Sequence, residues 1–195
     1  MKKTTSSNGR SSAVTGAESP VTTQPNEDAG ADHAPASPRR RRRETTPAQR
    51  ALGLLVRREH SKPELQRKLV ARGIADGEAE AAVAAMAEAG WQDDARFAAS
   101  LARNRATSGY GPVRIEAELA THGLPAEVIA GAFRTLEDEG EADWPARALD
   151  LLARRFDADV LADDILARRK AGDYLLRRGF GAEVLRAAVR QFCGR

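Results

Sequence analysis

The chain has 195 residues, enough for one or two ordinary domains, and a formal charge of +3 from 31 Lys and Arg against 28 Asp and Glu. Its one cysteine, Cys193, excludes an intrachain disulfide and is consistent with a reducing cytoplasm. No apolar run is long enough to span a membrane, and no apolar stretch follows Lys2 and Lys3 as a secretory signal requires. We therefore expect a cytoplasmic protein that does not contact a membrane.

Residues 1–46 show no apolar periodicity and are rich in Ser, Thr, Gly, Ala and Pro, with five consecutive arginines from Arg39 to Arg43. Such a segment cannot bury enough apolar surface to offset the entropy of ordering it, so we predict a disordered tail that is dispensable for folding. The tail holds eight Lys or Arg and five Asp or Glu, so residues 47–195 carry 23 of each and are neutral. Overall positive charge is therefore not what the folded part uses to bind a partner.

From Thr46 onward, strong helix formers dominate and no stretch alternates in the manner of a β-strand, which predicts an all-α fold. Two capping boxes, at Thr46 and at Ser61, mark the first two helix starts. We expect helices over 47–58, 62–72, 78–88, 94–107, 112–122, 126–136 and 144–156, followed by two more that Gly179 separates.

Three of the helix ends resemble one another, at Gly73, Gly123 and Gly179, with spacings of 50 and 56 residues. In each copy an apolar residue stands four positions before the glycine and another directly after it, as in a Schellman-type cap. Chance similarity between alanine-rich helices is the alternative, but the first two copies also share their helix starts. The third copy is looser, because its middle helix is longer and contains Gly172, which costs about 1 kcal/mol relative to alanine. We predict three tandem three-helix repeats that form an elongated array, over residues 47–90, 91–140 and 141–195, after the tail of residues 1–46.

Catalytic and metal-binding patterns are weak. The three histidines, His33, His60 and His122, form no helical pair, and a second cysteine that could complete a zinc site is missing. Asp93-Asp94 is better explained as a helix cap and its neighbour than as a carboxylate pair for a metal. We expect no enzyme activity, no cofactor and no metal.

Three-helix units are also the frame of helix-turn-helix modules, whose recognition helix needs basic or amide side chains. The third helix of the first repeat has no Arg or Lys over residues 79–86, and that of the second has only Arg134. Charge is uneven, since residues 135–164 carry ten acids and three arginines while residues 165–195 carry eight bases and two acids. Only the third repeat could therefore hold a phosphate backbone.

Two segments, 90–97 and 109–115, combine aromatic side chains, tight turns and arginines, as binding hot spots often do. We expect Trp91 and Phe97 to pack between repeats rather than to face a partner. The candidate partner-binding residues are the turn residues and the basic side chains of the third repeat, namely Arg96, Tyr110, Arg114, Arg168, Arg169, Lys170, Arg177, Arg178, Arg186 and Arg190.

The combination of motifs over roughly residues 47–192 resembles the RecX family. The residues that carry the resemblance are Gly90-Trp91, Asp93-Asp94, Arg96-Phe97-Ala98, Gly111-Pro112, Arg114-Ile115, Glu118-Leu119 and Gly123, preceded by Arg58, Ser61, Glu64-Leu65, Lys68-Leu69 and Arg72-Gly73 and followed by Arg178-Gly179-Phe180.

The resemblance implies a bacterial regulator of the RecA recombinase that binds the RecA–DNA filament, limits its growth and lowers recombinase and coprotease activity, and so affects DNA repair, recombination and the SOS response. It implies a monomer whose partner is the RecA filament, with at most weak, sequence-independent DNA binding. A helix-turn-helix-like DNA-binding regulator, acting through the basic third repeat and the arginine tail, is the alternative. A passive helical scaffold would explain none of the paired motifs.

Overall fold

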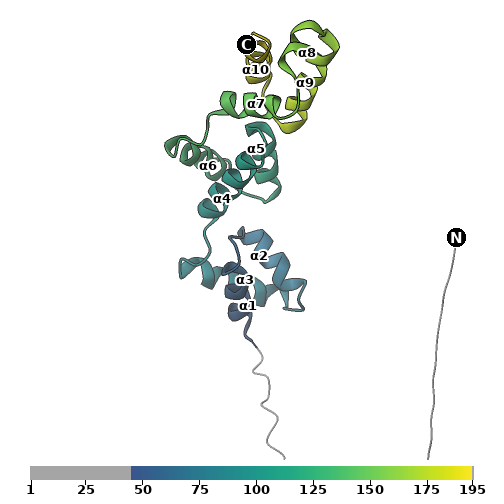
Figure 1. Cartoon of the computed structure of the whole chain (residues 1–195). Coiled ribbons are helices and arrows are strands. Elements are labelled where there is room, and N and C mark those ends of the chain that lie inside the picture. The colour runs from purple at the N-terminus through teal and green to yellow at the C-terminus, as the bar shows by residue number, and fades with distance from the viewer. Residues whose placement is uncertain (1–44, 195) are drawn as a thin grey trace, which may run out of the picture. The chain divides into compact units, whose positions relative to one another are not determined.

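The computed structural model describes residues 45–194, so the predicted disorder of residues 1–44 lies outside the described part. Within residues 45–194 the chain forms ten α-helices and no strand, which confirms the predicted all-α fold (Figure 1). The helices are α1 (Pro47–Leu55), α2 (Lys62–Val70), α3 (Asp76–Glu88), α4 (Asp94–Thr107), α5 (Pro112–Thr121), α6 (Ala126–Asp138), α7 (Trp144–Ala153), α8 (Ala158–Asp163), α9 (Ile165–Arg178) and α10 (Ala182–Cys193).

Helix starts follow the predicted caps. Thr46 and Gln49 form both halves of a capping box on α1, and the side chain of Ser61 accepts a hydrogen bond from the backbone N–H of Glu64 on α2. Asp93 accepts from two backbone N–H groups of α4, and Asp143 accepts from one of α7. These bonds satisfy donors that a helix cannot satisfy internally, so they fix where each helix begins.

The three similar helix ends share one packing arrangement. Gly73, Gly123 and Gly179 have φ angles of 83°, 71° and 88°, a left-handed conformation that glycine adopts without strain. The leucine four positions before each glycine is fully buried, and the apolar residue after it is buried too. These residues are Leu69 with Ile74, Leu119 with Leu124, and Leu175 with Phe180.

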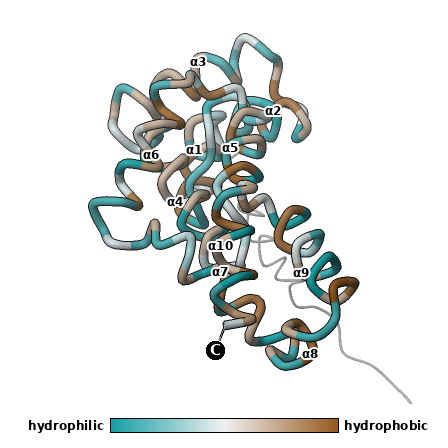
Figure 2. Tube along the Cα trace, turned by 90° about the horizontal axis from the view of Figure 1, so that it is seen from above, coloured by the Kyte–Doolittle hydropathy of each residue, from teal (hydrophilic) through white to brown (hydrophobic). Residues whose placement is uncertain are grey.

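Buried side chains form three separate cores, one for α1–α3, one for α4–α6 and one for α7–α10. Brown, apolar segments alternate with teal, hydrophilic segments along the helices in Figure 2, as expected when each helix buries one face. Trp144 contacts the second and third cores alike. Each repeat therefore buries its own apolar surface, and neighbouring repeats meet through a smaller set of contacts.

The third repeat differs from the prediction of a single long middle helix. Its chain forms two helices there, the short α8 and then α9, with Asp164 at the break. The side chain of Asp164 accepts a 2.7 Å hydrogen bond from the backbone N–H of Leu166, so it caps the start of α9. The break lets Leu161 of α8 bury its side chain in the third core.

Adjacent leucines of α9 provide a test of this core. Leu175 is fully buried, whereas Leu176 is 60% exposed. We expect Leu175→Ala to lower the free energy of unfolding in urea by about 2–5 kcal/mol, because it removes buried methyl groups and leaves a cavity. Leu176→Ala is the matched control and should change it by less than about 0.5 kcal/mol. Equal losses for the two variants would contradict the assignment of the core.

Candidate partner-binding surface

The first and second repeats meet at what we call the first junction, where the loop between α1 and α2 contacts the start of α4. Gln92, though polar, is buried, and its side-chain amide donates to the carbonyl of His60 (3.2 Å) and to the carboxylate of Asp94 (2.9 Å). The same carboxylate accepts a 3.0 Å hydrogen bond from the backbone N–H of Lys62, the first residue of α2. Asp94 therefore caps a helix of the neighbouring repeat.

A buried histidine lies behind this contact. His60 is 2% exposed, and its Nδ1 lies 3.1 Å from Oε2 of Glu64, whose carboxylate also pairs with Arg58. Burial lowers the pKa of His60 below its ordinary 6.5, although Glu64 opposes the shift. Burial by itself would raise the pKa of Glu64, but hydrogen bonds from Arg58 and His60 lower it further than burial raises it. The neutral imidazole is therefore the form that suits the folded protein.

Arg96, a predicted partner-binding residue, belongs to the first junction. Its Nε donates to Oε1 of Glu59 (2.9 Å), and its terminal nitrogens donate to the carbonyls of Gly90 (3.1 Å) and Trp91 (3.0 Å). The expectation that Trp91 packs between repeats is wrong, since this residue is 56% exposed. Phe97 is buried in the second core and packs edge-on against His122 at a centroid distance of 4.8 Å.

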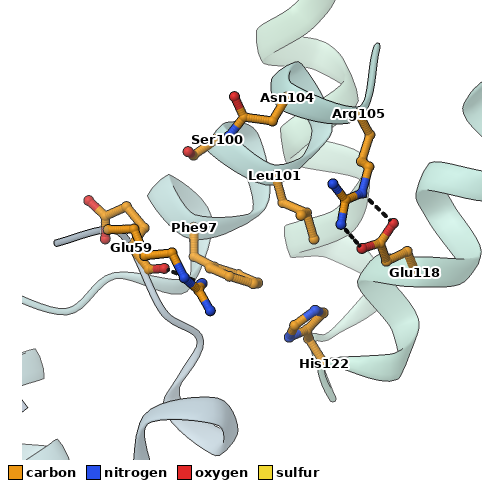
Figure 3. A pocket seen from close by; sticks show the side chains of 9 residues that line it. Glu59, Phe97, Ser100, Leu101, Asn104, Arg105, Glu118 and His122 are labelled. Carbon is orange, nitrogen blue, oxygen red and sulfur yellow. Dashed lines mark hydrogen bonds and ion pairs between the residues drawn. The ribbon is translucent and has the colours of Figure 1, made fainter. Parts of the chain in front are cut away.

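A pocket of about 380 Å³ opens beside the first junction, between Glu59 and helices α4 and α5 (Figure 3). Arg105 donates two hydrogen bonds to Glu118 across it, at 2.7 and 2.6 Å, and this pairing is the main cause that lowers the pKa of Glu118. Arg105 and Glu118 satisfy each other here, whereas Oε2 of Glu59 and Nδ1 of His122, which are also buried, have no hydrogen-bond partner within residues 45–194.

The second and third repeats meet at what we call the second junction, where the N-terminus of α5 contacts the C-terminus of α9. The backbone N–H of Gly111 donates to the carbonyl of Arg178 (2.8 Å), and that of Val113 donates to the carbonyl of Gly179 (3.1 Å). Gly111 caps α5 without a side-chain bond, and Pro112 has no N–H to satisfy. Backbone N–H groups that α5 leaves unpaired at its start therefore bond to carbonyls that α9 leaves unpaired at its end. The positive end of the α5 dipole faces the negative end of the α9 dipole.

This contact is close enough to exclude a side chain on either glycine. A Cβ atom on Gly111 would lie 2.4 Å from the carbonyl oxygen of Gly179, and one on Gly179 would lie 2.4 Å from Cβ of Arg114. Both distances are far below contact between non-bonded atoms, so the two helix ends require glycine at both positions.

Three predicted residues gather at the second junction. The guanidinium groups of Arg114 and Arg178 lie 4.9 and 5.2 Å from the ring centroid of Tyr110. Arg178 also lies 5.4 Å from the ring of Tyr174 and donates to the carbonyl of Ser108 at 3.2 Å. The contact between Arg178 and Tyr110 is a cation–π interaction between residues more than 60 positions apart in the sequence.

The other basic candidates lie on α9 and α10. Arg168, Arg169, Arg186 and Arg190 line a groove of about 610 Å³ between these helices, together with apolar side chains. Lys170 and Arg177 are exposed on α9 but do not line the groove. Eight of the ten predicted residues therefore lie at three separate places, and the other two lie elsewhere on α9.

Several residues that shape the junctions were not predicted. Glu59 and Gln92 organise the first junction, and Arg147 donates to the carbonyl of Ala106 at 3.2 Å near the second. Their partners lie 37, 32 and 41 residues away in the chain, so no local pattern marks them.

Within residues 45–194, no group of three His, Cys, Asp or Glu side chains is arranged to hold a metal ion. The helices described for this part of the chain lack the combined length and apolar character that crossing a membrane requires.

Two three-helix units and a third unit of four helices, each with its own core and joined by two compact junctions, define a class of helical-repeat proteins. Residues 49–85 match the family model described as the first three-helix domain of RecX, and residues 93–132 match its second three-helix domain. The chain belongs to the RecX family.

Known proteins agree with this assignment. The chain is 56% identical over 160 residues to the regulatory protein RecX of Stenotrophomonas maltophilia strain R551-3, covering 82% of this chain and 95% of that one. It is 57% identical over 160 residues to the regulatory protein RecX of Xanthomonas campestris pv. campestris strain B100, covering 82% and 96%. The crystal structure of RecX from Lactobacillus salivarius shares the fold, with a TM-score of 0.62 at 19% identity over 75% of this chain and 94% of that one.

Two glycines with similar backbone conformations test the second junction. Gly73 (φ 83°) has open space where a Cβ atom would lie, whereas a Cβ atom on Gly179 (φ 88°) would clash with Arg114. We expect Gly73→Ala to destabilise the protein by about 1–2 kcal/mol, the cost of a left-handed alanine. Gly179→Ala should cost about 1–3 kcal/mol more, because the crowded junction must open.

Amide hydrogen exchange locates the effect. The exchange rates of the N–H groups of Gly111 and Val113 should rise in Gly179→Ala, because this variant separates them from their acceptors. The same rates should not change in Gly73→Ala. Unchanged protection in both variants would show that the junction does not depend on this contact.

The first junction should make stability depend on pH. Because the pKa of His60 is lowered in the folded state, the unfolded chain binds a proton first as pH falls. The stability from a neutral His60 is fully present well above the ordinary pKa of about 6.5, and the free energy of unfolding should fall as pH drops through that value towards the lowered pKa of the folded state. Urea titrations of His60→Gln should show a smaller fall, and an identical pH dependence would refute this role for His60.

Proposed function

We propose that this protein binds the RecA–DNA filament and inhibits RecA recombinase and coprotease activity, and so modulates DNA repair and recombination. Membership of the RecX family, in which the similar proteins are named as regulators, supports this proposal. The observation that carries it is the second junction. Its backbone hydrogen bonds join the second repeat to the basic third repeat, and the Tyr110–Arg114–Arg178 cluster lies at the same contact. Several contact surfaces on one chain suit a partner made of repeating protomers, since each additional contact is intramolecular.

We propose further that the protein acts by binding and not by catalysis. The carboxylates and histidine that the structure brings together are engaged in internal contacts, as in the pairs Arg105–Glu118, Arg96–Glu59 and His60–Glu64. Arg96–Glu59 joins the first and second repeats, and the other two pairs lie within one repeat, so these groups support the fold. A monomer in the cytoplasm, where RecA acts on DNA, is the form we expect to function.

Inhibition of RecA tests the proposal directly. Increasing amounts of the protein should reduce RecA-driven ATP hydrolysis and strand exchange on single-stranded DNA. Arg186→Glu should weaken the inhibition by about tenfold, because it reverses a charge in the predicted binding surface. Arg57→Glu, which makes the same charge change on an exposed residue after α1, is the matched control and should inhibit normally. An absence of inhibition at every ratio of this protein to RecA would overturn the proposed function.

Direct DNA binding is the second candidate, and the four arginines around the α9–α10 groove are the observation that favours it. It requires tight binding to naked DNA that falls steeply between about 50 and about 200 mM salt, as counterions are released. Binding should be compared for the full chain and for a chain without residues 1–46. Affinity that survives the truncation, with no effect on RecA, would favour this alternative.

A further inference from the structure

The groove between α9 and α10 has an apolar floor, of which Leu185 and Val189 also pack against the core of the third repeat. Ile165, Arg169, Gly172 and Leu176 of α9 follow one another at intervals of four, three and four residues, which places them on one face of the helix. Ala182, Leu185 and Val189 of α10 line the opposite side. Two rows of this kind, side by side, are what a third helix would pack against.

Two large apolar side chains of this face are left mostly exposed within the described chain. Ile165 is 72% exposed and Leu176 is 60% exposed, although both line the groove with half-buried residues of the third core. Contiguous exposed apolar surface with a polar rim is typical of an interaction site. The groove therefore has the composition of a docking surface.

Gly172 has a role in this groove that its helix does not explain. Glycine in the middle of a helix is unfavourable, yet the backbone there is helical and a Cβ atom would meet only Cδ2 of Leu185, at 3.4 Å. Alanine would therefore fit the folded repeat. Glycine at this position keeps the groove deep, because a side chain here would fill the centre of the groove.

The charge on the rim is unbalanced. Four arginines, Arg168, Arg169, Arg186 and Arg190, line the groove with a single acid, Asp173. Within residues 45–194 none of these four makes an ion pair, whereas Arg58, Arg96, Arg103, Arg105 and Arg154 all do. Positive charge is thus left for an acidic partner.

We propose that this groove docks an acidic amphipathic helix of a protein partner. The apolar side chains of the helix would lie along the floor between Leu176 and Leu185, and carboxylates on its two flanks would pair with the arginines of the rim. A nucleic-acid backbone would satisfy the arginines but would leave Ile165 and Leu176 exposed, so the apolar floor favours a protein. This inference deepens the proposed function and rests on it only for the source of the helix, a RecA protomer.

A synthetic peptide tests the groove without RecA. The probe is a fluorescein-labelled peptide of about 18 residues, long enough to form a helix, with leucines on one face and glutamates on its flanks. A scrambled peptide of the same composition removes the amphipathic face. We expect the full chain to bind the amphipathic peptide in fluorescence anisotropy and to bind the scrambled one about tenfold more weakly.

Variants of the chain localise the binding. Leu176→Asp should weaken peptide binding by about tenfold, because it places a carboxylate on the floor beside the glutamates of the peptide. Val56→Asp makes the same kind of change at another exposed apolar residue, at 77% exposure in the first repeat, and should bind as the wild type does. Gly172→Ala should leave the melting temperature unchanged or higher while weakening peptide binding, because it fills the groove without disturbing the repeat. A purely structural role for Gly172 would not separate these two readouts.

The outcomes distinguish the inference from the proposed function. Failure of the peptide to bind, equal binding of the scrambled peptide, or equal binding by Leu176→Asp would overturn the inference. So would binding of a labelled oligothymidine that depends on Arg186 but not on Leu176, which would make the groove a nucleic-acid site. If wild-type protein inhibits RecA and Leu176→Asp inhibits equally, the inference fails and the proposed function stands. If the peptide binds as expected and RecA activity is unaffected, the inference about the groove is supported and the proposed function is wrong.

Discussion

The ends of α5 and α9 complete each other's backbone hydrogen bonding, and the placement of the third repeat depends on this contact. Every helix leaves donors at its start and acceptors at its end, which a side chain or water must usually satisfy. Here the donors of Gly111 and Val113 meet the carbonyls of Arg178 and Gly179, so these groups are satisfied by backbone alone. The contact is possible only because two glycines let the backbones approach, and as a consequence it brings Arg114 and Arg178 within cation–π distance of one tyrosine ring.

The first junction is built from different chemistry. The side-chain amide of Gln92 donates to the backbone carbonyl of His60 and to the carboxylate of Asp94, which also accepts from the backbone N–H of Lys62. The hydrogen bonds between α5 and α9 at the second junction join backbone groups only, whereas at the first junction a buried histidine, whose pKa burial lowers, lies beside the contact.

The arginines at the two junctions, in the pocket and around the groove fall into three groups by what they contact. Arg96 and Arg105 are engaged with glutamates and shape the first and second repeats, and Arg114 and Arg178 stack on tyrosines at the second junction. The arginines around the α9–α10 groove have no carboxylate partner within residues 45–194. Four arginines without an ion pair in the described chain therefore lie where apolar surface is also exposed, and this coincidence is what makes the third repeat the strongest candidate for partner binding.

The sequence alone determined most of the helices, several of their caps and the left-handed glycines Gly73, Gly123 and Gly179, because these depend on residues within one or two turns of each other. Leu69, Leu119 and Leu175 were recognisable as core positions for the same reason. Asp157 and Asp164 carried a local signal for the starts of α8 and α9, but it was hidden because they lie in a run of acids that is also typical of a charged surface. Tertiary structure alone decided that Trp91 is exposed, that Gly111 meets Gly179, and which arginines are paired. The contacts that build the junctions join residues more than 30 positions apart, and such pairs leave no periodic pattern in the chain, since either partner alone looks like an ordinary surface residue.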